Sequence, residues 1–515
     1  MACRHIARWI FPLLLVSALS DGRAQLLFPG SPRLDIQEPG LSSPLPSNSV
    51  SHLVVQGSVV WIGTSKGAGR SFDGGRSWEN FASVPAFARP GVFALTVRGD
   101  SVWCSTGFTQ DIDGSSVQTG AGYAYTLDDA ATWSFADQPL DAQDDSLVQY
   151  GVNTVRFLPV TVKEQNVTFD IALTTGTVWV ASWSSGLRKS TDRGATWNRI
   201  VLPNDDLSWI APTDSLGDYV VNPVPVDNFK AFSVFAEDDS TIWAGTAGGI
   251  NKSTDGGMSW RKFRSDNQSQ SVLSNWIIAI AAQQLGPTKR IWTTNWIAEG
   301  PGQRYGVSYT DNGGNSWTNI LVGVKAYGFG FRDSVVYIPT TEGIYRTDDG
   351  GSSFVRSGTI VDRATGQRIT SDTFFSVGIL GDTVFAGGAD GLVRTVDNAS
   401  HPFGLTWEIF RAYEPLTSEV QTYAYPNPFS PRFDVTRLHY ALPSSAADVT
   451  IEIFDFGMNR VRTVTRDAPR SGGTEYDEVW DGRDDSGSVV PNGVYFYRII
   501  VGGGEPLWGK ILVLA

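Results

Sequence analysis

The sequence predicts an all-β protein that consists of a long repeat array followed by a smaller C-terminal β-domain. The chain of 515 residues contains 55 glycines and 18 tryptophans, while charged residues make up only 18%. This composition is typical of short strands and tight turns rather than of long solvated helices. The hydrophobic fraction of 41% is sufficient to bury a core and excludes a disordered chain. The length itself predicts about two to four domains.

The charge of the chain restricts its binding partners. The formal net charge at pH 7 is −13. Proteins that bind nucleic acids present a basic surface, so we expect no nucleic-acid partner. An acidic surface is compatible with an extracellular protein and with cation binding, and it does not distinguish between them.

The first residues have the features of a secretory signal peptide. Arg4 and Arg8 supply a positive start, and residues 10–19 form a short apolar stretch that is followed by small residues. A membrane span needs about 20 apolar residues, so this stretch is too short to cross a bilayer, and no later stretch is long enough. We therefore predict a signal peptide over residues 1–24, an N-terminal linker over 25–47 and no transmembrane span.

The mature chain retains a single cysteine, Cys104, because Cys3 leaves with the predicted signal peptide. An intrachain disulfide is then impossible. Cys104 follows a strand-like apolar run, so we expect a buried thiol, with a reactive thiol as the alternative. The histidines are scattered and form no zinc-type cluster. We predict neither a bound metal nor a cofactor.

An internal repeat is the main feature of the first four-fifths of the chain. Residues 71–78, 190–197 and 253–260 share the pattern Ser-x-Asp-x-Gly-x-(Ser/Thr)-Trp without a gap. A copy at 126–133 has alanine in place of glycine, two copies at 310–317 and 347–354 are aligned with one extra residue, and a degraded copy begins at Thr395. The seven predicted box aspartates, with the aromatic residue that ends each box, are Asp73 with Trp78, Asp128 with Trp133, Asp192 with Trp197, Asp255 with Trp260, Asp311 with Trp317, Asp348 with Phe354, and Asp397 with a displaced Trp407.

Each box follows an aromatic β-rich run and a glycine turn, as at residues 60–64 and 242–249. Its aspartate is suited to accept backbone N–H groups two or three residues further on, which makes an Asx-type turn. Glycine tolerates the positive φ that such a turn needs, and the tryptophan can pack beneath it. We therefore expect a structural hairpin staple. Calcium binding or acid–base chemistry by these aspartates is the weaker alternative, because seven copies of one residue cannot all belong to one active site.

The boxes resemble the Asp-box, or BNR, repeats of sialidases, sortilin-type receptors and photosystem-assembly-factor-like propellers. The resemblance covers residues 48–412 and implies a seven-bladed β-propeller. In that family each blade has four antiparallel strands, and the box lies on the turn between the third and fourth strands. Six or eight blades remain alternatives, because the second and seventh boxes are degenerate.

The C-terminal segment lacks the repeat and has a different residue pattern. Residues 425–431 (YPNPFSP) are followed by alternating strand-like runs and by the turn-rich segment 479–487. These short strands predict a β-sandwich. Together with residues 451–464 and 491–499, they resemble the FlgD-type Ig-like domain and the related C-terminal sorting domains of type IX secretion. We assign residues 413–423 to a linker and 424–515 to this domain, which implies contact with the type IX machinery or, alternatively, a role as a spacer.

Long connections in the repeat array are the best sequence signal for a ligand. Five insertions interrupt it, at residues 107–122, 134–150, 198–230, 295–305 and 355–370. In a four-stranded blade all five belong to connections on the face opposite the boxes. Long loops on a rigid scaffold commonly carry binding residues.

Two of these insertions combine aromatic rings with charged groups, a combination that suits sugar or peptide recognition. The candidate ligand-binding residues are Asp205, Asp206, Trp209, Tyr219, Trp296, Glu299 and Arg304. The alternative is that the rings only pack the loops onto the propeller. Acidic residues at 111–113 and 141–145 hint at calcium, but neither segment has the full spaced set of oxygen ligands.

The chain shows no catalytic motif. The early Arg-Ile-Pro motif of sialidases is missing, and Tyr337-Ile338-Pro339 resembles it only in part. There is no G-x-S-x-G elbow and no H-E-x-x-H motif. We predict a non-catalytic binding module for a protein or glycan, secreted or displayed on the outer membrane of a Gram-negative bacterium. An extracellular glycoside hydrolase, sialidase-like or xyloglucanase-like, and a structural envelope component are the alternatives.

Overall fold

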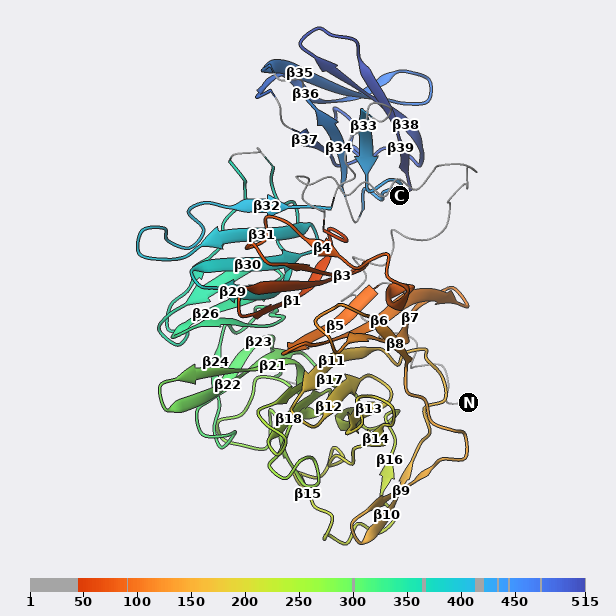
Figure 1. The fold of residues 1–515 in the computed structure, drawn as a ribbon, viewed down its shortest axis with the longest axis vertical. Helices are drawn as coiled ribbons and strands as arrows, with labels where there is room; N and C mark the ends of the chain where they lie inside the picture. The colour runs from red at the N-terminus through yellow and green to blue at the C-terminus, as the bar shows by residue number, and fades with distance from the viewer. Residues whose placement is uncertain are drawn as a thin grey trace. The chain divides into compact units, whose positions relative to one another are not determined.

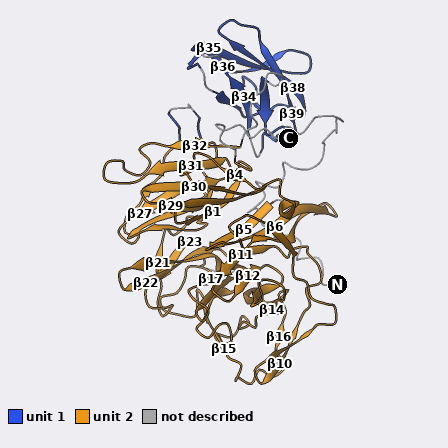
Figure 2. Cartoon of the chain, in the orientation of Figure 1, with its two compact units in different colours: residues 1–38, 361–368, 413–515 blue, residues 39–360, 369–412 orange. Residues whose placement is uncertain are grey.

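The computed structural model describes residues 45–514, apart from 90, 299–301, 364–366, 413–420, 433–434, 443–444 and 473–474. The predicted signal peptide, most of the predicted N-terminal linker and Glu299 lie outside the described residues. The described chain divides into two compact units, shown in Figure 2. Unit 1 contains residues 361–368 and 413–515, and unit 2 contains the residues before 361 together with 369–412.

The all-β prediction is confirmed. In the described parts of the chain the regular structure is almost entirely strand, and the helical segments are the single 3-10 turns η2 (Pro85–Phe87) and η3 (Asp227–Phe229). No helix among the described residues is long and apolar enough to cross a membrane.

Seven of the sheets in the described part of unit 2 follow one another along the chain, and each contains four strands joined as an antiparallel meander. In chain order they are β1 (Val50–Gln56), β2 (Val59–Thr64), β3 (Gly67–Ser71), β4 (Glu79–Asn80); β5 (Gly91–Arg98), β6 (Ser101–Ile112), β7 (Ser115–Thr126), β8 (Ser134–Asp137); β11 (Thr168–Leu173), β12 (Val178–Ser182), β13 (Gly186–Ser190), β14 (Asn198–Arg199); β17 (Ala231–Ala236), β18 (Ile242–Thr246), β19 (Gly249–Ser253), β20 (Trp260–Phe263); β21 (Trp276–Leu285), β22 (Thr288–Trp296), β23 (Gly306–Thr310), β24 (Thr318–Ile320); β25 (Gly330–Arg332), β26 (Val335–Thr340), β27 (Gly343–Thr347), β28 (Val355–Arg356); β29 (Phe374–Leu380), β30 (Thr383–Gly388), β31 (Gly391–Val396), β32 (Glu408–Phe410).

The long insertions add further strands to unit 2. β15 (Trp209–Ile210) pairs with β20 as a fifth strand of its sheet. β9 (Leu147–Tyr150), β10 (Asn153–Phe157) and β16 (Val220–Val221) form a separate small sheet. The predicted insertion at 107–122 is largely an extension of β6 and β7 into a long hairpin rather than an irregular loop.

Successive sheets of unit 2 contact one another through their first strands. β1 contacts β5, β5 contacts β11, β11 contacts β17, and β17 contacts β21. β25 contacts β29, and β29 contacts β1, so the last sheet lies against the first (Figure 1). Residues of β22 and β26 share one hydrophobic cluster, which joins the fifth sheet to the sixth.

Aromatic residues in the second strands form the core between the sheets. One ring from each sheet is fully or almost fully buried: Trp61, Trp103, Trp179, Trp243, Trp292, Tyr337 and Phe385. In the first, third and fourth boxes, the glycine lies directly on the buried ring of the neighbouring sheet. A Cβ built on Gly194 would lie 2.7 Å from the Trp103 ring, and one on Gly257 would lie 2.5 Å from Trp179. A Cβ on Gly75 would lie 3.0 Å from Phe385, which is the same contact between the first and the last sheet. These contacts, and φ values of +85° to +90°, explain the glycine in these three boxes.

Cys104 lies in β6 and is fully buried. Burial strongly raises the pKa of its thiol, so the thiolate needed for nucleophilic chemistry is absent at neutral pH. The structure therefore favours the inert thiol over the reactive alternative.

The C-terminal part of unit 1 contains two sheets. The first has the order β33 (Thr422–Tyr425), β34 (Thr436–Ala441), β37 (Glu475–Trp480), and the second has the order β36 (Arg460–Arg470), β35 (Ala447–Phe454), β38 (Gly493–Val501), β39 (Leu507–Val513). Leu438 and Trp480 of the first sheet and Val449 and Tyr497 of the second belong to one buried cluster. The two sheets therefore share a single core.

Candidate ligand-binding site

The regular boxes are self-contained turns. In the first box, Oδ1 of Asp73 accepts the Ser71 hydroxyl at 2.8 Å and the Ser77 N–H at 2.9 Å, and Oδ2 accepts the Ser77 hydroxyl at 2.6 Å. The Ser71 hydroxyl in turn accepts the Gly75 N–H at 2.8 Å. Asp128, Asp192 and Asp255 each accept the same two flanking Ser/Thr side chains.

The fifth and sixth boxes correct the sequence-based alignment. Asn312, and not Asp311, accepts the Ser316 N–H at 3.0 Å and the Thr310 hydroxyl at 2.9 Å. Asp349, and not Asp348, accepts the corresponding groups of the sixth box. The assignment of Asp311 and Asp348 is therefore wrong by one residue. With these acceptors both boxes fit the spacing without an extra residue. The fifth box has asparagine in place of aspartate, whose side-chain oxygen is an equivalent acceptor, and the sixth box ends in Phe354 in place of tryptophan.

Asp311 and Asp348 instead make ion pairs on the outer side of these turns. Both Asp311 oxygens accept hydrogen bonds from Arg290, at 2.7 and 2.8 Å. Asp348 pairs with Arg346 at 2.9 Å. Two side chains predicted to close a turn thus bind arginines instead: Arg290 lies in the neighbouring strand β22, and Arg346 lies in β27, which directly precedes Asp348.

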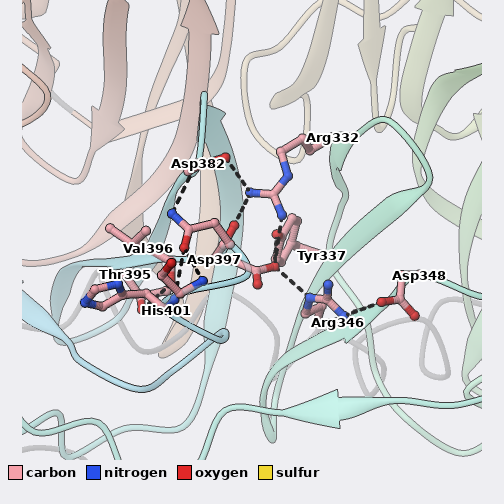
Figure 3. A network of polar contacts seen from close by, with 11 residues as sticks. Arg332, Tyr337, Arg346, Asp348, Asp382, Thr395, Val396, Asp397 and His401 are labelled. Atoms are coloured by element: carbon pink, nitrogen blue, oxygen red, sulfur yellow. Dashed lines mark hydrogen bonds and ion pairs between the residues drawn. The ribbon is translucent and has the colours of Figure 1, made fainter.

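Asp397 does not form a box either. The Thr395 hydroxyl donates to the Thr406 carbonyl at 2.7 Å instead of to Asp397. Asp397 follows β31 of the seventh sheet, yet its Oδ2 accepts hydrogen bonds from three side chains of the sixth sheet (Figure 3). They are the Tyr337 hydroxyl, Arg346 Nε at 2.6 Å and Arg332 Nη2 at 3.2 Å. The prediction that Asp397 is a box residue is wrong, because the longer connection between β31 and β32 leaves it free to bridge two sheets.

The box carboxylates are unsuited to proton transfer. The hydroxyl and amide of Thr132 and the hydroxyl of Thr126 lower the pKa of Asp128 to about 2. The equivalent bonds from Thr196 and Ser190 do the same for Asp192. Such a group stays ionised at neutral pH and has its lone pairs occupied by its own turn, so it is a poor general acid or base.

Most of the ligand residues predicted in the 198–230 connection have structural contacts. The Asp205 carboxylate accepts the N–H groups of Asp227 and Asn228 at 2.9 and 3.0 Å and so holds the turn η3. Tyr219 is buried, and its hydroxyl donates to the Leu202 carbonyl at 2.7 Å. These contacts support the alternative in which aromatic residues pack the loop onto the sheets.

Two other predicted residues of this connection face solvent. Trp209 in β15 is 52% exposed. Asp206 is exposed, and its backbone N–H donates to the Asn204 side chain at 3.1 Å. No hydrogen bond, ion pair or ring contact between described residues joins these side chains to those predicted at 296–304.

In the fifth sheet, Trp296 is only 1% exposed, and its indole N–H donates to the Ala326 carbonyl at 2.8 Å. Arg304 is exposed, and its backbone N–H donates to Ser274 Oγ at 2.8 Å. Glu299 lies outside the described residues. Trp296 is therefore a buried, fixed ring, whereas Arg304 faces solvent.

The sequence analysis missed Lys325, which completes this site. Its Nζ lies 4.2 Å from the Trp296 ring centroid and 5.5 Å from that of Tyr305. No carboxylate among the described residues lies within ion-pair distance of this ammonium group. Burial lowers the pKa of Lys325 to about 8. The available signal was a single lysine at the start of an aromatic run, residues 325–331. The site thus combines a half-buried cation with aromatic walls, and the exposed Arg304 precedes Tyr305 in the chain.

Within the described parts of the chain, no group of three or more His, Cys, Asp or Glu side chains is placed to hold a metal ion. The acidic segments that hinted at calcium serve other purposes. Asp111 accepts the Gly114 N–H at 3.0 Å in the β6–β7 turn, and Asp141 pairs with Arg188 at 2.8 Å.

A comparison with protein families finds one matching domain, near the C-terminal end of the chain. Residues 433–501 match the FlgD Ig-like domain. The predicted resemblance of the C-terminal segment to this domain is thereby confirmed over residues 433–501. No curated protein matches the chain.

Several solved structures are similar to the chain at low sequence identity. PorZ, a surface component of the type IX secretion system of Porphyromonas gingivalis, is 15% identical with a TM-score of 0.36, over 91% of this chain and 66% of that one. YCF48 from Cyanidioschyzon merolae is 18% identical with a TM-score of 0.41, over 69% and 98%. An ancestral GH74 enzyme is 13% identical with a TM-score of 0.48, over 90% and 62%.

The matched domain contains a polar cluster around the buried His439. His439 in β34 lies between two acids of β37, with Nδ1 2.9 Å from Asp477 and Nε2 3.2 Å from Glu475. The Tyr423 ring lies 4.9 Å from the imidazole. The cluster ties neighbouring strands of this sheet together.

Proposed function

We propose that the seven sheets of unit 2 are the blades of an Asp-box β-propeller spanning residues 48–412, and that residues 424–515 form an Ig-like sandwich. Three observations support the propeller. Each sheet is a four-stranded meander, box turns follow the third strand in the first six sheets, and the last sheet contacts the first. The repeated contact between a box glycine and the aromatic ring of the preceding sheet supports a common blade geometry.

We propose that this propeller is a non-catalytic binding module for an acidic group on a protein or glycan. The observation that carries the proposal is Lys325, an ammonium group between the rings of Trp296 and Tyr305 with no described carboxylate beside it. Half-burial of a cation without a counter-ion is unfavourable, and the aromatic faces compensate it only in part. A carboxylate or sulfate on the ligand would supply the missing charge, and the exposed Arg304 can add a second contact.

The predicted signal peptide and the FlgD Ig-like domain support a secreted or outer-membrane surface location in a Gram-negative bacterium. We propose that the C-terminal domain contacts the type IX secretion machinery. The producing bacterium tests this directly: deletion of residues 424–515 should leave the propeller inside the cell. Undiminished secretion of the shortened chain would instead support the spacer alternative.

Binding to carboxylated probes tests the function of the Lys325 site. Oligogalacturonate and sialyllactose represent acidic glycans, and polyglutamate represents an acidic protein segment. We expect saturable binding to one class, lost in Lys325→Gln. Lys66→Gln is the matched control, because Lys66 is an exposed lysine in the turn between β2 and β3. Equal binding by both variants contradicts the proposal, and turnover of a probe would support the hydrolase alternative.

A further inference from the structure

The sheet formed by β36, β35, β38 and β39 in the C-terminal part of unit 1 has an apolar outward face (Figure 1). Alternate residues of these strands, such as Ile451, Tyr497 and Ile511, belong to the buried cluster between the two sheets. Because successive side chains of a strand point to opposite faces, the residues between them lie on the outward face. Such a face is ordinarily polar in an antiparallel sheet, so its aromatic residues need an explanation.

The strand register places two phenylalanines of this face between two cations. Phe454 of β35 lies opposite Phe496 of β38 on one side and opposite Arg460 of β36 on the other. Phe496 lies in turn opposite Lys510 of β39. Directly opposite residues share one face of a sheet, so the aromatic centre has a positive charge at each edge.

Aromatic rings also project from the face. Phe456, in the turn after β35, is 77% exposed, and its ring lies 6.3 Å from that of Phe496. Met458 of the same turn is 51% exposed, and Trp508 of β39 is 45% exposed. The Trp508 ring lies 5.7 Å from that of Phe454, which fixes it on the sheet. The turn and the sheet therefore present one continuous apolar surface.

The acids of this surface are already engaged, whereas one cation is not. Glu452 of β35 pairs with Arg498 and, at 3.4 Å, with Arg460. Asp455 accepts a backbone N–H of its own turn at 2.8 Å. Lys510 is exposed, and it makes no ion pair with any described residue. A partner that complements this surface is therefore apolar where it meets the rings and anionic where it meets Lys510.

The size of the surface favours a lipid surface over a stable protein partner. A whole aromatic side chain presents about 150–250 Å². The exposed parts of Phe456, Met458, Trp508 and Val494 then amount to about 400 Å². A stable protein interface buries about 800 Å² on each partner. A peripheral membrane contact needs only a few apolar side chains that enter the headgroup region, together with cations that stay at its surface.

We propose that the aromatic face of the C-terminal domain, defined by Phe456, Met458, Trp508, Arg460 and Lys510, docks on an anionic lipid surface. Phe456 and Met458 enter the headgroup region, and Trp508 lies at its boundary with water. Arg460 and Lys510 contact the anionic headgroups from either edge of the face. This contact is separate from the Lys325 site and does not require the type IX secretion machinery.

Flotation of the chain without its predicted signal peptide tests the proposal. The probes are vesicles of phosphatidylcholine alone and vesicles in which one-quarter of the lipid is phosphatidylglycerol. We expect the wild type to float with the anionic vesicles and more weakly with the neutral ones. Phe456→Ser should weaken binding on the order of tenfold, because it removes the most exposed ring. Phe72→Ser is the matched control, since Phe72 is a 56% exposed phenylalanine in the first box of unit 2, and it should bind like the wild type.

Lys510→Gln tests the charge of the face separately. It should weaken binding to the anionic vesicles about fivefold and leave binding to the neutral vesicles unchanged. Phe456 and Lys510 are both exposed, so thermal unfolding of the two variants should match that of the wild type. Met458→Gln replaces Phe456→Ser if that variant fails to fold, and it should also weaken vesicle binding.

Absence of binding to both kinds of vesicle overturns the proposal, as does equal binding by the wild type and the Phe456 variant. Sedimentation analysis covers the other occupant: dimerisation of the wild type that is lost in Phe456→Ser assigns the face to a second copy and also overturns the lipid contact. Deletion of residues 424–515 in the bacterium tests export independently. Vesicle binding by the purified chain, combined with undiminished secretion of the shortened chain, would reject the export role and retain the lipid contact.

Discussion

Arg346 Nε donates a hydrogen bond of 2.6 Å to Oδ2 of Asp397, and this contact joins the sixth and seventh sheets of unit 2. The Asp397 side chain is only 5% exposed, and Tyr337 and Arg332 donate to the same oxygen. Although burial alone raises it, the pKa of Asp397 is held below its ordinary value by the hydrogen bonds from Tyr337 and Arg346. The ionised form of this side chain is therefore the one that stabilises the fold.

Asp397→Asn should lower the free energy of unfolding at neutral pH by about 3 kcal/mol, because it leaves two arginines facing a neutral group. Chemical denaturation measures the effect. Asp348→Asn is the control, since Asp348 forms an exposed pair with Arg346 and should cost less than about 1 kcal/mol. A lowered folded-state pKa contributes stability above the unfolded value of 3.8, and this stability is lost as the pH falls through the folded value. The difference between wild type and Asp397→Asn should therefore shrink below about pH 4, and a constant difference would contradict this account.

The register of the fifth and sixth boxes gives a second prediction. Asn312→Ala and Asp349→Ala should each lower the free energy of unfolding by about 1–2 kcal/mol, because the N–H groups of the turn lose their acceptor. Asp311→Ala and Asp348→Ala remove only partly exposed ion pairs and should each cost less than about 1 kcal/mol. Thermal unfolding of the four variants compares the neighbouring positions directly. Larger losses at 311 and 348 would restore the original alignment.

The box errors show what sequence can and cannot provide here. The pattern correctly predicts that a turn closes near residues 310–317, because glycine, serine and tryptophan recur at fixed distances. It misplaces the acceptor because an aspartate, Asp311, stands directly before Asn312. Only the hydrogen bonds of the folded turn show that the asparagine is the residue that accepts the Ser316 N–H. The role of Asp397 cannot be predicted from a local pattern at all. Its hydrogen-bond partners lie in another sheet, and the packing of the sheets brings them near.

The candidate sites depend on long-range contacts in the same way. Aromatic and acidic residues in an insertion predict binding equally well whether they face solvent or the core, and Trp296 and Tyr219 are buried. Lys325 becomes a candidate only when the fold places Trp296 and Tyr305 around it.

Binding at the Lys325 site should depend on pH. Burial lowers the pKa of Lys325 from 10.5 to about 8, so the ammonium group is lost as the pH rises through this value. Affinity for a carboxylated probe should fall between about pH 7 and about pH 10, with a midpoint shifted upward by the bound anion. Lys325→Arg should abolish the dependence, because a guanidinium group stays protonated throughout. Titration calorimetry across this range measures it, and an identical fall in the arginine variant would place the titrating group elsewhere.

Asp170 gives a prediction of opposite sign to that of Asp397. It lies in β11, and its carboxylate accepts two backbone hydrogen bonds of 2.9 Å. The donors are the N–H of Val234 in β17 and the N–H of Ile171, the next residue in the chain. Desolvation nevertheless raises its pKa from 3.8 to about 7. A raised folded-state pKa contributes stability that is fully present below about pH 4 and is lost as the pH rises through about 7. The wild type should therefore lose about 3 kcal/mol of stability from this group between these limits.

Asp170→Asn replaces the protonated acid with a neutral side chain of the same shape, so it should flatten the pH dependence and exceed the wild type in stability above about pH 7. Asp238→Asn is the control. Asp238 has a pKa lowered to about 2, chiefly by the Ser240 hydroxyl and by the amides of Thr241 and Ser240. Its replacement should leave the profile between about pH 4 and about pH 8 parallel to that of the wild type, because Asp238 does not titrate there. Urea denaturation at a series of pH values separates the two variants. Parallel profiles for wild type and Asp170→Asn would mean that this carboxylate is ionised throughout and that the two amide donors outweigh its desolvation.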